Sequence, residues 1–533
     1  MLRLSLLLTS FVLGALAQTE VCPRAPIGGE IQDPQNVWSS EGSLKIDFSF
    51  RTYIDRYRQR RYCYLTSAGV QAPTLRLQPG DELILNLAND LPEEVMAAPA
   101  HTHRDDCAGG AMTPSSTNLH FHGLALPPAC HQDETLRTAI RPSAAFEYRT
   151  RIPKDEAPGL YWYHPHPHGY TQPQVLGGAS GALIVEGIER VKPQVAGLPE
   201  RVIVLRDQSV PGFSESDEDA GPGKDITVNF VPILFPVYRP AMMTVPPGER
   251  EFWRVLNASA GTFFDLQIRY GRIIQDVNDV RNIELIALDG VPVGKDAEIT
   301  HILLSPGGRA EFIMTTPPAG VWGQLVTLAY DTGPDGEASP YRVIANLVSR
   351  DDAPRPPTMP AAPVREAKSF AGLSRLKPER ERKLYFSEER DPAAPNDPNA
   401  IKYFITLEGA APKVFDMDFD RPDIVVEQGT VEDWIIENRA REVHSFHIHQ
   451  LHFQLLERDG AVLNEPALRD TIDIPYWDGK SEEYPRVKLR MDFRSAQIAG
   501  TFVYHCHILE HEDGGMMGSI RVKPRAHPPA KPN

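Results

Sequence analysis

Apolar and polar residues alternate along short segments of the chain. Leu44, Ile46 and Phe48 are separated by charged or polar residues, and leucines recur at positions 83, 85 and 87. A period of two residues places every second side chain on the same face of a β-strand. Proline and glycine turns recur at short intervals, and no long segment has the period of an amphipathic helix. We therefore predict an all-β chain of sandwiches or barrels.

A longer pattern of strand, turn glycine, strand and asparagine occurs three times. In each copy the asparagine follows the glycine by nine residues, and the pairs are Gly80 with Asn89, Gly248 with Asn257, and Gly429 with Asn438. Successive copies begin 168 and 181 residues apart, which is the length of a domain. We therefore predict three homologous domains. Asn257 also begins a glycosylation sequon, but its place in the repeat favours a structural role.

Both ends of the chain and one internal stretch set the predicted domain boundaries. Arg3, an apolar run and then Ala15-Leu16-Ala17 predict a secretory signal peptide over residues 1–17. This run is too short to span a bilayer. The stretch 351–375 begins with many prolines and predicts a linker. The predicted domains cover residues 18–190, 195–350 and 376–525, and residues 526–533 form a tail.

Charge and hydropathy narrow the class of protein. The formal net charge of −16 disfavours nucleic acid or an anionic membrane as a partner. No later segment approaches the apolar length that spans a membrane. We expect an exported protein, periplasmic or extracellular, with no membrane span.

The five cysteines leave one unpaired in an exported protein. Cys506 is the exception on chemical grounds, because it lies between His505 and His507 and is followed by His511 and Met516. A thiolate, an imidazole and a weak thioether form the ligand set of a blue-copper electron-transfer site. The other four cysteines suffice for two disulfides. The sequence leaves their pairing open, and the simplest pairing is Cys22 with Cys63 and Cys107 with Cys130.

Ten of the 17 histidines lie in four compact groups, each with a His-x-His pair. The groups are His120 and His122; His164 and His166; His444, His447 and His449; and His505, His507 and His511. Two imidazoles at this spacing leave the same face of a strand and can reach neighbouring metal ions. Zinc also accepts imidazole and thiolate. However, eight histidines without carboxylates exceed a single zinc site, and several copper ions fit better.

The parity of positions sorts these histidines into two sites. His505 and His507 face away from Cys506 on an extended strand, so one strand would serve two metal centres. His444 is an odd number of residues from His447 and His449. We therefore expect His444 to face the site that holds Cys506.

Four motifs, NLHFHGL, YWYHPHPHG, HSFHIHQLHF and YHCHILEHEDGGMM, resemble the copper-binding motifs of three-domain multicopper oxidases, the laccase-like group. The three repeats match that family's three cupredoxin-like Greek-key β-sandwich or barrel domains. The resemblance implies four copper ions: one type 1, one type 2 and two type 3. It assigns the type 1 ion to His444, Cys506, His511 and axial Met516, in preference to the neighbouring Met517. It assigns the type 2 ion to His120 and His447, one type 3 ion to His122, His164 and His507, and the other to His166, His449 and His505.

The resemblance also implies the reaction. A small-molecule reductant would give up electrons singly, and O2 would be reduced to water at a cluster between the first and third domains. The second domain would act as a spacer and substrate wall, and we expect a monomer. Glu512, next to His511, and Asp133 are candidate proton carriers. His452 is expected beside the cluster rather than on a metal. His168 is expected beside the cluster or exposed, and His101, His103 and His131 in loops.

The electron donor is less constrained. The chain has 11 methionines but no methionine-rich insertion of the kind found in cuprous oxidases. This favours an organic donor, a phenol or an aromatic amine, over a cuprous or other metal ion. A non-catalytic copper-binding protein of the same fold is the alternative, and it would be expected to lack some of the ligands.

Overall fold

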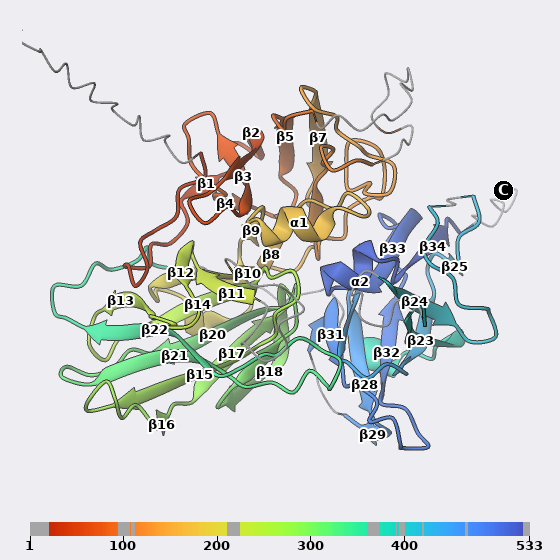
Figure 1. Cartoon of the computed structure of the whole chain (residues 1–533). Coiled ribbons are helices and arrows are strands. Elements are labelled where there is room, and N and C mark those ends of the chain that lie inside the picture. Colours follow the sequence, from red (N-terminus) through yellow and green to blue (C-terminus); the bar gives the residue numbers. More distant parts are fainter. Residues whose placement is uncertain are drawn as a thin grey trace, which may run out of the picture.

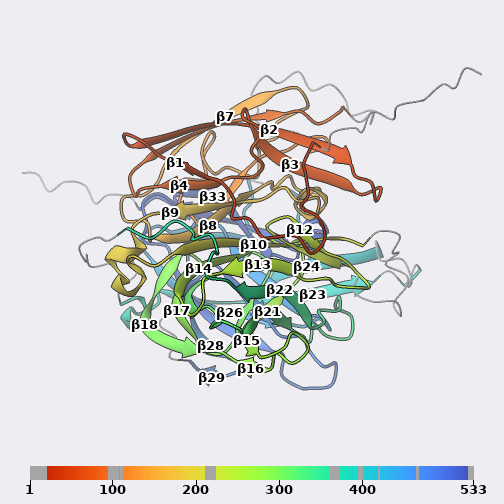
Figure 2. The same ribbon diagram turned by 90° about the vertical axis from the view of Figure 1, so that its left-hand side faces the viewer.

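A computed structural model describes residues 21–525 except 94–106, 108–111, 211–223, 361–371, 391, 394–399, 418–419 and 464–466. The predicted signal peptide, the predicted tail, His101 and His103 lie outside the described residues. In the described residues, six β-sheets form three successive pairs (Figure 1), and the first pair lies above the other two in Figure 2. The all-β prediction is confirmed. Among the described residues, no helix combines the length and apolarity needed to cross a membrane.

The first pair of sheets contains the strands of residues 36–185. One sheet has the order β1 (Asn36–Trp38), β4 (Thr74–Leu77), β9 (Gly181–Val185), β8 (Gly159–His164) and β6 (His120–His122). The facing sheet has the order β3 (Arg60–Thr66), β2 (Ser43–Ile54), β5 (Glu82–Asn89) and β7 (Ala145–Arg151). Leu83 and Leu85 of β5 are fully buried in one core with Leu75 and Leu183 of the other sheet. The alternation in the sequence therefore marks the inward face of β5.

The second pair contains the strands of residues 200–349. Its larger sheet has the order β12 (Val231–Ile233), β11 (Lys224–Val228), β10 (Glu200–Ser209), β14 (Arg250–Asn257), β20 (Arg309–Thr315), β17 (Ile283–Leu288) and β18 (Val291–Ile299). The facing sheet has the order β13 (Ala241–Val245), β22 (Arg342–Ser349), β21 (Trp322–Leu328), β15 (Phe264–Gly271) and β16 (Asp279–Val280), with β19 (Ile302–Leu304) beside β15.

The third pair contains the strands of residues 380–523. One sheet has the order β24 (Ile401–Leu407), β23 (Arg380–Arg390), β26 (Val431–Asn438), β32 (Arg486–Asp492), β28 (Phe453–Arg458) and β29 (Ala461–Val462), with β30 (Leu468–Arg469) beside β28. The other has the order β25 (Ile424–Glu427), β34 (Met517–Lys523), β33 (Gly500–Cys506), β27 (His444–Ile448) and β31 (Thr471–Ile474).

The repeated asparagine has the same bonding in all three pairs. It ends β5, β14 and β26, each of which lies parallel to the first long strand of its pair: β2, β10 and β23. Oδ1 of Asn257 accepts the N–H of Ser259, and its Nδ2 donates to the carbonyls of Thr262 and Leu304. Asn89 and Asn438 bond in the same way to the residue two positions on and to two carbonyls. Each side chain therefore closes the turn after its strand.

The predicted linker is in contact with the second pair of sheets over part of its length. The carbonyl of Pro357 accepts the N–H of Glu200, and the N–H of Met359 donates to the carbonyl of Leu198. Residues 361–371 of the linker are outside the described part. Short 3₁₀ turns lie nearby: η1 (Ile188–Arg190), η2 (Pro193–Val195) and η3 (Leu373–Arg375).

Two short helices join the first and third pairs of sheets. Helix α1 (Thr171–Leu176) lies beside α2 (Leu509–Asp513), as Figure 1 shows in yellow and blue. The carboxylate of Asp513 accepts the N–H groups of Thr171 and Gln172 at 3.0 and 2.8 Å. A carboxylate at these orphan donors is favourable, because the first N–H groups of a helix have no partner within it.

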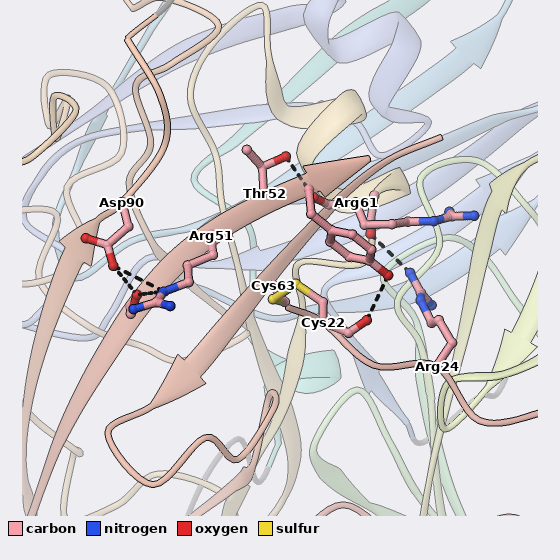
Figure 3. The surroundings of a disulfide bond; sticks show 10 residues. Cys22, Arg24, Arg51, Thr52, Arg61, Cys63 and Asp90 are labelled. Carbon is pink, nitrogen blue, oxygen red and sulfur yellow. Dashed lines mark hydrogen bonds and ion pairs between the residues drawn. A yellow bond between two sulfur atoms is a disulfide. The ribbon is translucent and has the colours of Figure 1, made fainter. Parts of the chain in front are cut away.

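Both disulfides have the simplest pairing, Cys22 with Cys63 and Cys107 with Cys130. The first attaches the segment before β1 to strand β3 (Figure 3). Arg24, close to this bond in the sequence, donates to the carbonyl of Gly177 at 3.1 Å. In the described part of the chain, the free thiol is that of Cys506, which is buried.

Candidate metal centre

The four histidine groups come from two pairs of adjacent antiparallel strands. In the first pair of sheets, β6 and β8 place His120 opposite His164. In the third, β27 and β33 place His447 opposite His505. His122 follows His120 on β6, whereas His166, His449 and His507 lie just past the ends of their strands. The strand pairing thus concentrates eight imidazoles at one junction.

These eight rings form a single buried cluster across the first and third pairs of sheets. None is more than 2% exposed. The ring of His120 stacks on that of His449 with centroids 3.8 Å apart, and His122 stacks on His447 at 3.9 Å. His166 lies with its centroid 5.2 Å from that of His505. Half of the cluster therefore comes from each of two domains.

The ring nitrogens converge as ligands of shared cations would. Nε2 of His505 lies 3.2 Å from Nε2 of His449 and 3.5 Å from Nε2 of His166. Two ligands each about 2 Å from one metal ion are separated by such a distance. Within the described chain, the buried nitrogens without a hydrogen-bonding partner include His120 Nε2, His122 Nδ1, His164 Nε2, His447 Nε2 and both nitrogens of His507. Buried polar atoms are rarely left unpaired, so a metal centre fits them.

Burial also fixes the charge state of the cluster. It lowers the pKa of His164 and of His505 to about 3, and it lowers the pKa values of His120, His122 and His447 well below the ordinary value. Neighbouring imidazoles add to the effect, because two imidazolium ions repel each other. The rings are therefore neutral near pH 7, which is the form that binds metal.

A second group of ligands lies at the end of β33. Sγ of Cys506 lies 3.6 Å from Nδ1 of His444 and 3.7 Å from Nδ1 of His511, and the two Nδ1 atoms are 3.2 Å apart. Met516 is fully buried in the same apolar cluster as Cys506. Burial raises the pKa of the Cys506 thiol, so a thiolate here requires a bound cation. Thiolate, two imidazoles and a thioether are the donor set of blue copper.

Carboxylates meet the outer edges of both imidazoles in this second group. Oε1 of Glu388 lies 3.2 Å from Nε2 of His444, and Oε1 of Glu442 lies 3.2 Å from Nε2 of His511. Burial, and then the adjacent Glu388 carboxylate, raise the pKa of Glu442. The Tyr403 ring stacks on His511 with centroids 4.4 Å apart. The side chains of Glu388 and Glu442 remain 16% and 11% exposed, so these carboxylates lie between the buried histidines and solvent.

The two carboxylates predicted as proton carriers are both buried against the eight-histidine cluster. Oε2 of Glu512 lies 3.1 Å from Nδ1 of His505, and its Oε1 lies 3.5 Å from Nε2 of His166. Asp133 contacts Nδ1 of His120 at 3.0 Å. Burial raises the pKa of Glu512 well above its ordinary value and that of Asp133 to about 8. Burial therefore favours the protonated form of both groups.

The sequence motifs missed Asp470 and Arg309. Asp470 is fully buried, and its Oδ1 lies 3.1 Å from Nε2 of His122. Arg309, from the second pair of sheets, donates to both oxygens of this carboxylate at 2.7 Å. Neither residue lies in a histidine motif. Asp470 lies between β30 and β31, and the local sequence Leu468-Arg469-Asp470-Thr471 gave no signal of a metal centre.

The remaining singled-out residues lie around the two sites. Nε2 of His452 donates to the carbonyl of Asp289 at 2.8 Å, in keeping with packing beside the cluster. His168 is partly buried and its ring packs edge-on against Phe415 at 5.3 Å. His131 stacks on Phe146 in a loop. Met517 belongs to a different apolar cluster from Met516.

Two family models, both described as multicopper oxidase, match residues 111–190 and 391–526. These ranges contain all twelve predicted copper ligands. The chain belongs to the multicopper oxidase family. Copper binding follows from this membership, and the buried histidine groups fit copper sites.

Relatives within the multicopper oxidase family span most of the chain. A multicopper oxidase (mco) of Staphylococcus aureus is 26% identical over 462 residues, 84% of this chain and 81% of that protein. A laccase of Bacillus subtilis is 22% identical over 485 residues, 84% of this chain and 88% of the laccase. The structure of a Campylobacter jejuni multicopper oxidase, described as a metallo-oxidase, aligns with a TM-score of 0.68 at 23% identity. It covers 93% of this chain and 96% of its own, and this likeness establishes the cupredoxin-like fold.

Proposed function

We propose that the chain is an oxidase that takes electrons singly from a small-molecule donor and reduces O2 to water. The observation that supports this proposal most directly is the end of β33. There Cys506 faces one ligand group, while its neighbours His505 and His507 belong to the eight-histidine cluster. Four copper ions bound at these two sites would supply storage for the four electrons that the reaction needs. We retain the ligand assignment implied by the motifs. The convergence of His166, His449 and His505, and of His444, Cys506 and His511, supports it.

The surroundings of the two sites support electron uptake at the Cys506 group and O2 reduction at the histidine cluster. The Cys506 group lies beneath the partly exposed carboxylates of Glu388 and Glu442, so a donor can approach the edges of His444 and His511. The eight-histidine cluster is enclosed, which excludes bulky donors. Glu512, between His505 and His166, can pass a proton to oxygen at the cluster, because burial raises its pKa and so favours its protonated form.

For the donor, a second candidate class competes with phenols and aromatic amines. The ionised Glu388 carboxylate beside His444 creates a negative field that attracts a cation, such as a cuprous or ferrous ion. The absence of a methionine-rich insertion from the sequence supports an organic donor instead. The family includes both kinds, since the Bacillus subtilis relative is a laccase and the Campylobacter jejuni protein is described as a metallo-oxidase.

The test begins with fully copper-loaded protein. We expect four copper ions per chain, a blue absorption band and O2 uptake without accumulation of hydrogen peroxide. Full loading at fewer than four ions, or no O2 uptake with a phenol, an aromatic amine, Cu(I) or Fe(II), would contradict the oxidase. The relative kcat/KM of a phenol and of Cu(I) then decides the donor class. Export is part of the proposal, and the two disulfides support it because disulfides persist in oxidising compartments.

A further inference from the structure

The second pair of sheets carries none of the predicted copper ligands, but it places a buried arginine beside the histidine cluster. Arg309, the first residue of β20, is fully buried. Its guanidinium donates two bonds of 2.7 Å to the Asp470 carboxylate, and its Nε donates to the carbonyl of Leu160 at 3.1 Å. A planar fork on a carboxylate holds both groups in one orientation. One side chain thus links the second domain to the first and the third.

Asp470 in turn contacts one histidine from each half of the cluster. Its Oδ1 accepts the Nε2–H of His122 at 3.1 Å, and its backbone carbonyl accepts the Nδ1–H of His447 at 2.8 Å. Thr471 Oγ1 donates to the same Oδ1 at 2.9 Å. The rings of His122 and His447 are the pair that stack at 3.9 Å. A single residue therefore orients both members of the stack.

The backbone around this pair is fixed as well. The carboxylate of Asp289 accepts the N–H of Arg309 at 2.9 Å and the N–H of Asp470 at 3.1 Å. Gly123, which follows His122, has a φ of +89°, and a Cβ there would lie 2.4 Å from Arg309 Nη2 and 2.7 Å from Asp470 Oδ2. Gly307 brings the second domain against the cluster directly, because a Cβ there would lie 2.9 Å from Nε2 of His507. This close approach requires glycine at both positions.

We propose that Arg309 and Asp470 are positioning residues that fix the ring orientation and the protonated nitrogen of His122 and His447, so that the second domain completes the metal centre. A neutral imidazole carries one N–H, and an acceptor at the outer nitrogen leaves the inner lone pair for the metal. The inner atoms, His122 Nδ1 and His447 Nε2, are buried and have no hydrogen-bonding partner in the described part of the chain. This inference rests on one part of the proposed function, namely that the histidine cluster binds copper.

The test compares Asp470→Asn and Arg309→Lys with matched changes in a remote pair. Arg201 and Glu251 form a similar buried two-bond pair, at 2.6 and 3.0 Å, within the second pair of sheets. Arg201→Lys and Glu251→Gln therefore control for the general cost of weakening such a pair. Each variant is titrated with copper, and the copper in the histidine cluster is followed by electron paramagnetic resonance alongside the blue absorption band.

We expect Asp470→Asn to lower the affinity of the histidine cluster for copper about 10- to 100-fold, the usual effect of losing an outer partner of a ligand histidine. Arg309→Lys keeps the charge but not the fork, so it should cause a smaller loss. The blue band should be unchanged, because Asp470 contacts neither Cys506 nor its two histidines in the described structure. Wild-type affinity and resonance spectra in both variants would overturn the inference, as would an equal loss in Arg201→Lys and Glu251→Gln. If the histidine cluster of the wild-type protein binds no copper, both this inference and the proposed function are wrong.

Discussion

Nδ1 of His120 lies 3.0 Å from the carboxylate of Asp133. The same carboxylate accepts the N–H of Phe121 at 2.9 Å and the side-chain amide of Gln450 at 2.6 Å. Gln450 belongs to the third domain and Asp133 to the first, so the contact closes the cluster across two domains. Asp133 thus holds His120 in the way that Asp470 holds His122.

Asp133→Asn should weaken copper binding by His120 and His447 about 10- to 100-fold. A neutral amide accepts the outer N–H of His120 less strongly than a carboxylate does. Copper titration followed by electron paramagnetic resonance measures the change. Full copper retention with slowed O2 uptake would instead assign Asp133 to proton delivery alone.

Glu512→Gln should slow O2 reduction by about 10²-fold or more while copper is retained, because general acid catalysis contributes factors of that size. Reduction of the blue site under nitrogen should proceed normally, since it requires no proton at the cluster. Glu156→Gln is the matched control: Glu156 is also buried in the described structure, where it accepts the N–H of Ala125 at 3.1 Å. Unchanged O2 uptake in Glu512→Gln would end the proton-carrier proposal.

Met516→Leu and Met517→Leu should separate the two methionines. Both exchanges nearly conserve volume, so each should cost less than about 1.5 kcal/mol of stability. Met516→Leu should raise the reduction potential of the blue site, because a thioether lowers it relative to an apolar residue. Met517 packs with Leu136 and Val503 instead, and its exchange should leave the potential unchanged. Redox titration of the blue band is the measurement; a shift in Met517→Leu alone would reverse the assignment.

Glu388→Gln and Glu442→Gln test the cationic donor. If a metal ion is the donor, each loss of a carboxylate beside His444 or His511 should raise its KM about tenfold, equivalent to ~1.4 kcal/mol. A neutral phenol assayed on the same variants serves as the internal control. Equal effects on both donors would exclude charge attraction as the role of these carboxylates.

Glu156 should make stability depend on pH. Burial raises its pKa from 4.5 to about 7, so between these values the folded chain binds a proton that the unfolded chain has released. The free energy of unfolding should therefore fall as pH rises through this window, by up to ~1.4 kcal/mol per pH unit. Glu156→Gln should flatten this part of the profile, measured by denaturant unfolding between pH 4.5 and 7. An unchanged slope would contradict the assignment.

Local patterns in the sequence predicted strands and brought out the histidines and Cys506 as candidate ligands. Leu83, Leu85 and Leu87 predicted the buried face of β5 because side chains on a strand alternate. The same parity separated His444 from His447 and His449, and the structure places His444 beside Cys506. The glycine–asparagine spacing predicted the repeat because each asparagine bonds to groups close to its own turn.

Only the tertiary structure revealed the partners that the histidines have across domains. The all-β class and the grouping of the histidines could be read from the sequence, since alternation and spacing depend on neighbours within a few positions. Arg309 and Asp470 are 161 residues apart, and Glu388 and Glu442 lie on separate segments of the third domain. Nothing in their local sequence records these contacts. They exist because three hydrophobic cores pack together and bury these side chains, and a buried charge is stable only when it is paired.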